Sequence, residues 1–350
     1  MAHPADDTPF MQRCFDLAEL GAGNVAPNPL VGAVIVYDSK IIGEGFHAYY
    51  GGPHAEVNAV NSVGNKEKKL LPFSTLYVNL EPCSHHGKTP PCTELILKTG
   101  IKKVIIANRD IHPLVNGKGM KRLRKAGCSV QAGVLKEQGE WLNRRFFTYH
   151  RKKRPYIILK WAQSADGFFT KDSRKQHWLT GEQSRMLVHR WRSEEAAIMA
   201  GTNTVRIDNP RLTNRLWMSG RQPVRIIIDR NLTLPRNLNV FDTSAPTVVF
   251  TARKSAGKKN IRYVQLTFGN DFLQAVMRTL FEMQVQSVMV EGGAKLLAEC
   301  IRQNLWDEAR IFTAEKFWGA GTPAPALEGK IISHKTVGND LLRILINENN

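Results

Sequence analysis

The chain has 350 residues and carries 49 Lys and Arg against 31 Asp and Glu, a formal net charge of +18. Its length allows two domains with separate cores, and 42% hydrophobic with 23% charged residues is a globular composition. The longest apolar runs, such as 31–37, have the length of strands, which argues against membrane-spanning helices. Residues 1–10 lack the basic flank and apolar core of a signal peptide, and five irregularly spaced cysteines do not suggest a disulfide framework. We therefore expect a cytoplasmic protein.

Apolar periodicity in the first half predicts an α/β domain over residues 1–150. Helices are expected at 10–22, just after His54, and at 92–98, 118–126 and 135–147; strands are expected at 30–37, 41–47, 74–80, 103–107 and 129–132. The first two strands form a hairpin, and the remaining order indicates a mostly parallel sheet with a ligand site at one edge.

The basic segment 151–155, which ends in a proline, is the expected linker to a second α/β domain over residues 151–350. Strands are expected at 156–162, 196–200, 224–229, 247–250 and 287–290; helices are expected at 183–192, 270–283 and 294–303. The turn Glu291-Gly292-Gly293 lies between a strand and a helix, where backbone N–H groups can bind phosphate. It lacks the Gly-x-Gly-x-x-Gly fingerprint, and a simple tight turn is the alternative interpretation.

One motif carries recognisable chemistry: His54-Ala55-Glu56, followed by Pro82-Cys83 and Cys92. An imidazole and two thiolates suit Zn²⁺ and leave a fourth position for water, whose pKa the metal lowers. Glu56 is close enough to shuttle the proton of that water, as in the zinc deaminases of nucleobase-like rings. A closed structural zinc site, completed by His85 or His86, is the alternative, but such a site does not need Glu56.

Basic and aromatic residues alternate between Arg144 and Arg154, a pattern that can track a nucleic-acid backbone and stack bases. The alternative, which we favour, is the end of an amphipathic helix that runs into a solvated linker. Binding of nucleic acid is therefore not expected, and the positive field suits a small phosphorylated substrate.

From about residue 11 to about residue 312 the chain resembles the bifunctional deaminase/reductase family of riboflavin biosynthesis. The shared motifs are Pro27–Gly32, His54–Glu56, Glu81–Cys92, Lys160, Ser164–Gly167, Gly201–Val205, Asp208–Pro210, Leu212–Thr213, Arg215 and Val290–Gly293. The family has eight residues between its two metal-binding cysteines, as found between Cys83 and Cys92.

The resemblance implies a cytidine-deaminase-like three-layer domain followed by a dihydrofolate-reductase-like α/β domain. It implies zinc on His54, Cys83 and Cys92, with Glu56 as the proton shuttle. The deaminase pocket would contain Asn28, His47, His85 and Lys88. NADPH would lie against Ala162, Trp178, Thr204, Asp208, Gly292 and Gly293. The reductase substrate would lie against Lys160, Arg192, Leu212, Arg215 and Glu291.

The expected substrate is a small pyrimidine nucleotide, first deaminated at C2 and then reduced at C1′ of its ribosyl group. Reductase domains of this family tend to pair, so a homo-oligomer is expected. The chain departs from the family pattern in three places: Gln176 replaces a frequent serine, Ile111-His112 replaces Pro-Asn, and Ala165 replaces leucine. A nucleic-acid-editing deaminase, a zinc-stabilised RNA-binding protein and a chain with only one active half remain as alternatives.

Overall fold

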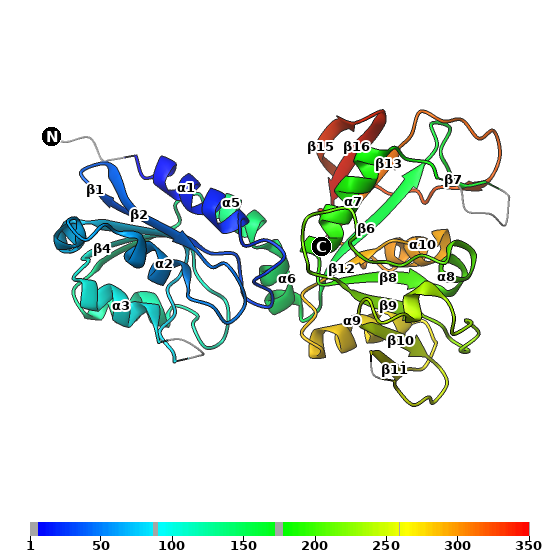
Figure 1. Cartoon of the computed structure of the whole chain (residues 1–350), viewed down its shortest axis with the longest axis horizontal. Helices are drawn as coiled ribbons and strands as arrows, with labels where there is room; N and C mark the ends of the chain where they lie inside the picture. The colour runs from blue at the N-terminus through cyan, green and yellow to red at the C-terminus, as the bar shows by residue number, and fades with distance from the viewer. Residues whose placement is uncertain (1–5, 87–89, 172–177, 259, 350) are drawn as a thin grey trace. The chain divides into compact units, whose positions relative to one another are not determined.

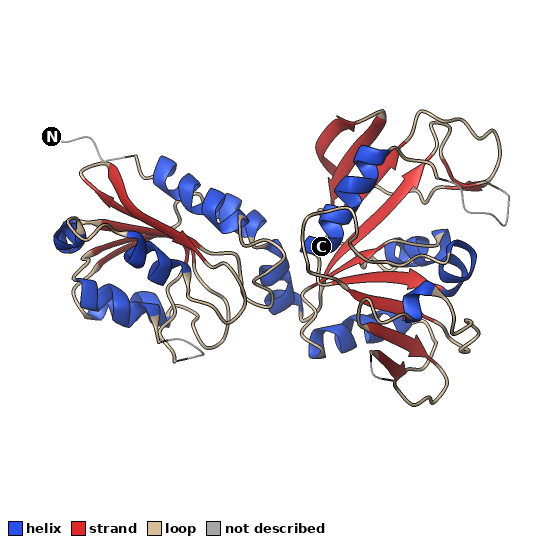
Figure 2. Ribbon diagram, in the orientation of Figure 1, coloured by secondary structure: helices blue, strands red, loops and turns tan. Residues whose placement is uncertain are grey.

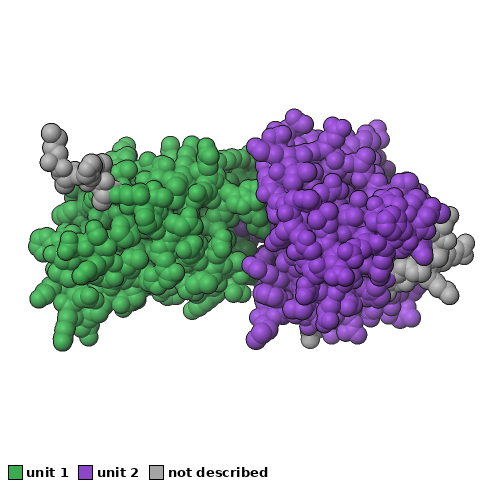
Figure 3. Space-filling model, turned by 90° about the horizontal axis from the view of Figure 1, so that it is seen from above, with its two compact units in different colours: residues 1–152 green, residues 153–350 purple. Residues whose placement is uncertain are grey.

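The computed structural model describes residues 6–86, 90–171, 178–258 and 260–349 (Figure 1). The chain divides into two compact units, Met1–Lys152 and Lys153–Asn350, coloured separately in Figure 3. Each unit encloses its own clusters of buried apolar side chains, as separate cores require. No described helix is long and apolar enough to cross a membrane.

Unit 1 contains a five-stranded sheet in the order β2-β1-β3-β4-β5. Its strands are β1 (Gly32–Tyr37), β2 (Lys40–Phe46), β3 (Thr75–Leu80), β4 (Lys103–Asn108) and β5 (Ser129–Ala132). β1 pairs antiparallel with both β2 and β3, whereas β3, β4 and β5 pair in parallel. Four of the five strands therefore run in one direction, which confirms the predicted hairpin and mostly parallel sheet.

Helices cover both faces of this sheet, which gives the three layers expected from the resemblance (Figure 2). One face packs against α1 (Thr8–Glu19) and α5 (Lys136–Leu142). The other packs against α2 (Ala55–Ser62), α3 (Cys92–Thr99) and α4 (Lys118–Lys125). A 3₁₀ turn over Lys68–Phe73 connects α2 to β3.

The prediction of one continuous helix over 135–147 is wrong, because the structure has two helices there, α5 and α6 (Arg144–Lys152). Asn143 separates them: it accepts a hydrogen bond from the N–H of Leu30 at 2.8 Å and donates one to the carbonyl of Leu30 at 2.9 Å. These two bonds place the α5–α6 junction beside the start of β1. The helix also includes Arg151 and Lys152, which the sequence placed in the linker.

The aromatic residues of the basic segment are packed inside unit 1. Phe146, Phe147 and Tyr149 are buried on α6, while basic side chains such as that of Arg151 stay accessible. Because the buried rings have no free face on which bases can stack, the segment is the end of an amphipathic helix.

Unit 2 contains a nine-stranded sheet in the order β11-β10-β9-β8-β12-β6-β13-β16-β15. The strands are β6 (Tyr156–Gln163), β8 (Ala197–Gly201), β9 (Val224–Ile228), β10 (Thr247–Thr251), β11 (Ile261–Gln265), β12 (Ser287–Val290), β13 (Glu308–Thr313), β15 (Lys330–Val337) and β16 (Asp340–Ile346). Pairing is parallel from β11 to β13, and β16 and β15 add two antiparallel pairings. Short strands β7 (Phe168–Thr170) and β14 (Thr322–Pro323) pair apart from this sheet.

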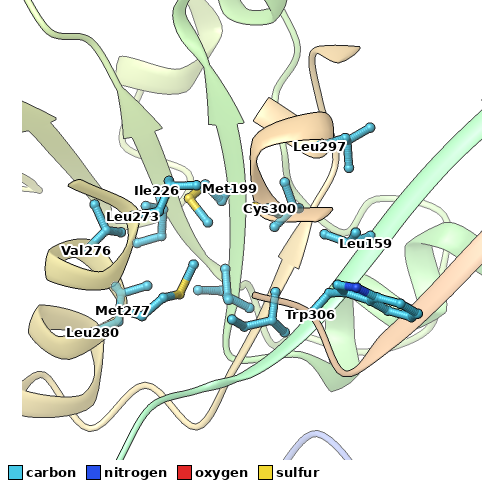
Figure 4. Packing of buried hydrophobic residues seen from close by; sticks show 14 of the residues in the cluster. Leu159, Met199, Ile226, Leu273, Val276, Met277, Leu280, Leu297, Cys300 and Trp306 are labelled. Atoms are coloured by element: carbon cyan, nitrogen blue, oxygen red, sulfur yellow. The ribbon is translucent and has the colours of Figure 1, made fainter. Parts of the chain in front are cut away.

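Four helices cover the two faces of this sheet. One face packs against α7 (Glu182–Glu194) and α8 (Thr202–Asp208), near a 3₁₀ turn over Asn239–Phe241. The other packs against α9 (Phe272–Glu282) and α10 (Ala294–Arg302). Figure 4 shows Leu273, Val276 and Leu280 of α9 directed at the strands that carry Met199 and Ile226. Each such side chain contributes roughly 1.5–3 kcal/mol when it is fully buried.

Candidate active sites

The deaminase-like site begins at the N-terminus of α2. Close packing of α2 on β2 depends on Gly45, where a Cβ would lie 2.4 Å from the backbone nitrogen of Ala59. His54 precedes the helix in an extended conformation, and Glu56 lies in its first turn with 3% of its surface exposed. The glycine therefore helps to fix the helix end that carries both residues of the His-x-Glu motif.

Cys83 and Cys92 reach His54 from two other elements. Cys83 follows β3, and Cys92 is the first residue of α3. The Nδ1 atom of His54 lies 3.2 Å from Sγ of Cys92 and 3.6 Å from Sγ of Cys83. The three ligand atoms all lie within 4.8 Å of one another, so the described residues form the three-donor cluster that zinc prefers.

Protonation within this cluster reflects burial and mutual contact. Hydrogen bonding from Cys92 lowers the pKa of Cys83 to about 4, whereas the pKa of Cys92 is raised by the same contact and by burial. Burial also raises the pKa of Glu56, and the charge of Cys83 adds to this effect. A carboxyl group whose pKa is raised from its usual range is suited to take up and release a proton near neutral pH.

Asn28 and His47, two of the residues expected in the deaminase pocket, lie beside this cluster. Nδ1 of His47 donates to the carbonyl of Pro53 at 2.9 Å, and burial lowers the pKa of His47. Nε2 of the neutral ring therefore accepts from Nδ2 of Asn28 at 3.0 Å. The rings of His47 and His54 meet edge to face, with their centroids 5.5 Å apart.

His85 is half-buried, and its Nδ1 atom has no hydrogen-bond partner among the described residues. This atom is available for a substrate. Lys88, the fourth expected pocket residue, lies outside the described residues, so the structure does not test its position.

Glu81 is a site-forming residue that the sequence analysis did not assign a role. Its buried carboxylate accepts hydrogen bonds from the N–H groups of Gly117 at 2.9 Å, Met120 at 3.1 Å and Asp110 at 3.3 Å. These bonds attach Glu81, which lies two positions before Cys83, to α4 and to the loop that precedes α4. The Glu-Pro-Cys sequence, which places Glu81 next to a proposed metal ligand, is the signal from which a role at this site could have been predicted.

Among the expected cofactor residues, Thr204, Gly292 and Gly293 meet just after the ends of β8 and β12. A Cβ on Gly292 would lie 2.8 Å from the methyl group of Thr204, and Gly293 has φ of +70°. Thr204 therefore lies directly against the turn that starts α10, whose N–H groups can bind a phosphate group. Asp208 lies one turn further along α8, and burial raises its pKa.

Ala162 and Trp178 are placed differently. Ala162 lies near the end of β6 and is partly buried against an apolar cluster. Trp178 is 61% exposed and has the Arg185 guanidinium 5.2 Å from its ring centroid. Gln176, the departure from the family pattern before Trp178, lies outside the described residues.

Four of the residues expected to hold the reductase substrate, Lys160, Arg192, Arg215 and Glu291, form a charged cluster. Arg192 on α7 makes two hydrogen bonds to the Glu291 carboxylate, of 2.6 and 2.7 Å. Burial alone would raise the pKa of Glu291, but Arg192 and Lys160 hold it below the usual range. Burial lowers the pKa of Lys160, and Glu291 opposes that shift.

Arg215 joins the cluster through Thr213. Arg192 donates to the Thr213 carbonyl at 3.2 Å, and Arg215 donates to the Thr213 hydroxyl at 3.0 Å. No described carboxylate forms an ion pair with Arg215, so its charge is available to an anion. Leu212 has 2% of its surface exposed and its side chain packs in a core cluster, so only its backbone can face a ligand.

Asp166, which lies in the shared Ser164–Gly167 motif, forms hydrogen bonds with a neighbouring side chain and with the backbone. Its carboxylate accepts from the Ser164 hydroxyl at 2.5 Å and from the N–H groups of Trp318 at 3.1 Å and Gly319 at 2.7 Å. The Ser164 hydrogen bond is the main reason that its pKa is lowered to about 2. Asp166 therefore holds the loop around residue 318.

Together the two sites define a zinc-dependent deaminase joined to an α/β reductase. The model of the cytidine and deoxycytidylate deaminase zinc-binding region matches residues 4–108, and that of the RibD C-terminal domain matches residues 155–342.

Relatives and solved structures agree with both matches. The riboflavin biosynthesis protein RibD of Aquifex aeolicus is 42% identical over 90% of this chain and 88% of its own. RibD of Escherichia coli is 35% identical over 90% of this chain and 89% of its own. The Thermotoga maritima diaminohydroxyphosphoribosylaminopyrimidine deaminase/5-amino-6-(5-phosphoribosylamino)uracil reductase is 38% identical, with a TM-score of 0.88 over 97% of this chain and 98% of its own.

The chain belongs to the RibD family of riboflavin biosynthesis proteins, which join a zinc-dependent deaminase to an NADPH-dependent reductase. The resemblance stated from the motifs is thereby confirmed, and so is the bifunctional enzyme class. An editing deaminase or an RNA-binding protein without turnover would leave the match over residues 155–342 unexplained.

Proposed function

We propose that this chain deaminates 2,5-diamino-6-(5-phosphoribosylamino)pyrimidin-4-one and then reduces the resulting 5-amino-6-(5-phosphoribosylamino)uracil with NADPH. One observation carries the proposal. In unit 1 the three proposed zinc ligands lie together near buried Glu56. In unit 2 of the same chain, Arg192 pairs with Glu291 in the turn between β12 and α10, and Lys160 interacts electrostatically with that carboxylate.

In the deaminase site, we assign zinc binding to His54, Cys83 and Cys92. A bound zinc ion would supply an activated water. Glu56 accepts the proton of the attacking water and delivers it to the amino group that leaves C2 as ammonia. Asn28, His47, His85 and Lys88 bind the substrate, and the Nδ1 atom of His85, which has no hydrogen-bond partner among the described residues, supports this role.

In the reductase site, we assign NADPH to Ala162, Trp178, Thr204, Asp208 and the Gly292-Gly293 turn. The cofactor would supply a hydride to C1′ of the ribosyl group. Arg192, Leu212, Arg215 and Glu291 hold the substrate, and the unneutralised guanidinium of Arg215 suits its phosphate.

Ring opening breaks the bond between C1′ and the ring oxygen, and that oxygen must gain a proton. We assign the proton to Lys160, because its pKa is lowered by burial and it lies in the electrostatic field of Glu291. The lowered pKa makes the ammonium group a better proton donor than an exposed lysine.

We also propose that the enzyme works in the cytoplasm as a homo-oligomer that pairs through unit 2. The five cysteines are free, and two of them belong to the proposed zinc site. The edge strand β15 exposes Ile331 and Ile332, which supports pairing at this end of the sheet.

The test follows NADPH absorbance after the diaminopyrimidinone nucleotide is added to wild-type protein and to Glu56→Gln. We expect oxidation by the wild type and none by the variant, because without deamination no uracil is formed for the reductase. Release of ammonia without oxidation would remove the reductase assignment. Absence of both signals in zinc-replete protein would overturn the whole proposal.

The matched control gives Glu56→Gln the deaminated uracil nucleotide directly. The variant should then oxidise NADPH at the wild-type rate, since its substitution lies in unit 1. A failure to do so would show that Glu56→Gln damages folding rather than one chemical step.

A further inference from the structure

His189 is a buried histidine that none of the assignments above includes. It lies on α7, three residues before Arg192, with 5% of its surface exposed. Its Nδ1 atom lies 2.9 Å from the backbone nitrogen of Arg215. A backbone N–H can only donate, so Nδ1 is the acceptor and the ring proton lies on Nε2.

The surroundings of His189 favour this neutral form. Burial lowers the pKa of His189 to about 4, and the charges of Arg192 and Arg215 act in the same direction, while Glu291 opposes them. A protonated ring would carry hydrogen on Nδ1 and could not accept the Arg215 N–H. The neutral ring is therefore the state that holds the loop.

The loop that carries Arg215 is otherwise closed upon itself. The N–H of Asn214 donates to Gln222 at 2.8 Å, and Gln222 donates back to the Asn214 carbonyl at 2.8 Å. The Asn214 amide also binds the backbone of Trp217 and Ser219. These bonds give residues 214–222 a defined shape but do not attach that shape to α7.

Attachment to α7 comes from hydrogen bonds of His189 and Arg192 and from the Arg190 guanidinium, which lies 5.5 Å from the centroid of the Trp217 ring. His189 binds the backbone of Arg215, and Arg192 binds the Thr213 carbonyl. Beyond Arg215 the loop exposes apolar side chains, with Trp217 41% and Met218 fully accessible. Among these contacts with α7, the bond to His189 is the one that acts on the Arg215 backbone itself.

We propose that His189 is a positioning residue for the reductase reaction. It fixes the Arg215 backbone so that the guanidinium group of Arg215 and that of Arg192 converge on the substrate anion. The proposal rests on the reductase function proposed above. It adds that anion affinity depends on a neutral imidazole that itself need not touch the substrate.

The experiment compares His189→Leu with His189→Asn in the intact chain, using the uracil nucleotide and NADPH. Oδ1 of asparagine occupies the same branch position as Nδ1 of histidine and can accept the Arg215 N–H, whereas leucine fills the space without an acceptor. Loss of one buried hydrogen bond should raise the KM for the nucleotide roughly tenfold in His189→Leu. The KM for NADPH should change little, and His189→Asn should recover most of the nucleotide affinity.

Coupling to Arg215 separates positioning from general damage. In an Arg215→Ala background, His189→Leu should add almost nothing to the KM for the nucleotide, because the group that it places is already absent. Ammonia release by unit 1 and the thermal transition of the chain report folding, and Met186→Ala on the exposed face of α7 serves as the matched control.

Equal nucleotide KM values for His189→Leu and wild type would overturn the inference, as would full additivity with Arg215→Ala. A failure of His189→Asn to improve on His189→Leu would also overturn it. If the wild type oxidised no NADPH with the uracil nucleotide, the proposed function would fail instead, and the two failures are thereby distinguished.

Discussion

The deaminase and reductase sites are built in opposite ways. The deaminase site draws its zinc-binding side chains and Glu56 from residues 54–92, at the starts of two neighbouring helices and the end of β3. The reductase cluster draws Lys160, Arg192, Arg215 and Glu291 from four segments spread over more than one hundred residues. A metal ion can hold the first set together, whereas ion pairs and backbone hydrogen bonds must hold the second.

The two sites are therefore vulnerable to substitution in different ways. Three convergent ligands depend on one another through the metal, so loss of one ligand removes the function of all. In the reductase cluster each side chain has its own supporting bonds, and damage should be graded. The buried Arg192–Glu291 pair is the exception, because either partner alone leaves an uncompensated charge.

The largest expected effect is the loss of one zinc ligand. Cys92→Ser should abolish zinc binding at stoichiometric metal and lower ammonia release by at least about 10³-fold, because a hydroxyl does not replace a thiolate ligand. Metal analysis and an ammonia assay measure both. Cys128 is a buried cysteine outside the cluster, so the Cys128→Ala variant should still bind zinc. Loss of zinc from this variant as well would indicate misfolding.

The next largest effect is expected from breaking the buried Arg192–Glu291 ion pair of unit 2. Arg192→Met should destabilise unit 2 by about 3–5 kcal/mol and abolish reduction, because it leaves the Glu291 charge buried without its partner. Denaturant unfolding and NADPH oxidation measure the two consequences. The double variant Arg192→Met/Glu291→Met should recover stability but not activity, and recovery of activity would contradict the assigned role of Glu291.

A smaller effect is expected at the turn before α10. Gly292→Ala places a Cβ 2.8 Å from the Thr204 methyl group, so the turn must shift and the KM for NADPH should rise roughly tenfold. Thr204→Ser removes that methyl group and should partly restore the KM in the double variant. Steady-state kinetics at saturating nucleotide give these values, and an unchanged KM for Gly292→Ala would remove the turn from the cofactor site.

The smallest effect is a pH dependence of unit 2. The pKa of His189 is lowered from an ordinary value near 6.5 to about 4, so the folded state binds this proton only at a lower pH than the unfolded chain does. The corresponding stability is present above about pH 6.5 and is lost progressively as the pH falls towards about 4. Unfolding of wild type and His189→Asn between pH 4 and 7 measures it, and equal slopes would contradict the assignment.

Helix and strand positions in unit 1 were largely predictable, because each apolar period coincides with one buried face. The helix over 135–147 was not, since its break depends on Asn143 binding the backbone of Leu30, more than one hundred residues away. In unit 2 the sequence analysis did not identify β11, β13, β15 and β16. Strand β15 is a mostly exposed edge strand, and β16 lies between it and β13, a partner from further back in the chain.

Among the site residues, the zinc motif was readable because the metal dictates donor type and spacing. Glu81 and His189 were not assigned, since their partners are backbone N–H groups that carry no residue signature. The Asp166 carboxylate of the Ser164–Gly167 motif likewise accepts from backbone N–H groups, those of Trp318 and Gly319.

The sequence by itself determined the chemistry of this protein: a zinc-binding deaminase motif, a glycine turn before a helix, and a set of cationic residues beyond a linker. The tertiary structure decided which of those charges meet. It paired Arg192 with Glu291 and left Arg215 without a described carboxylate partner. The physical reason is that residue types specify what a group can bind, while packing over long sequence separations decides which partner lies within a few ångströms.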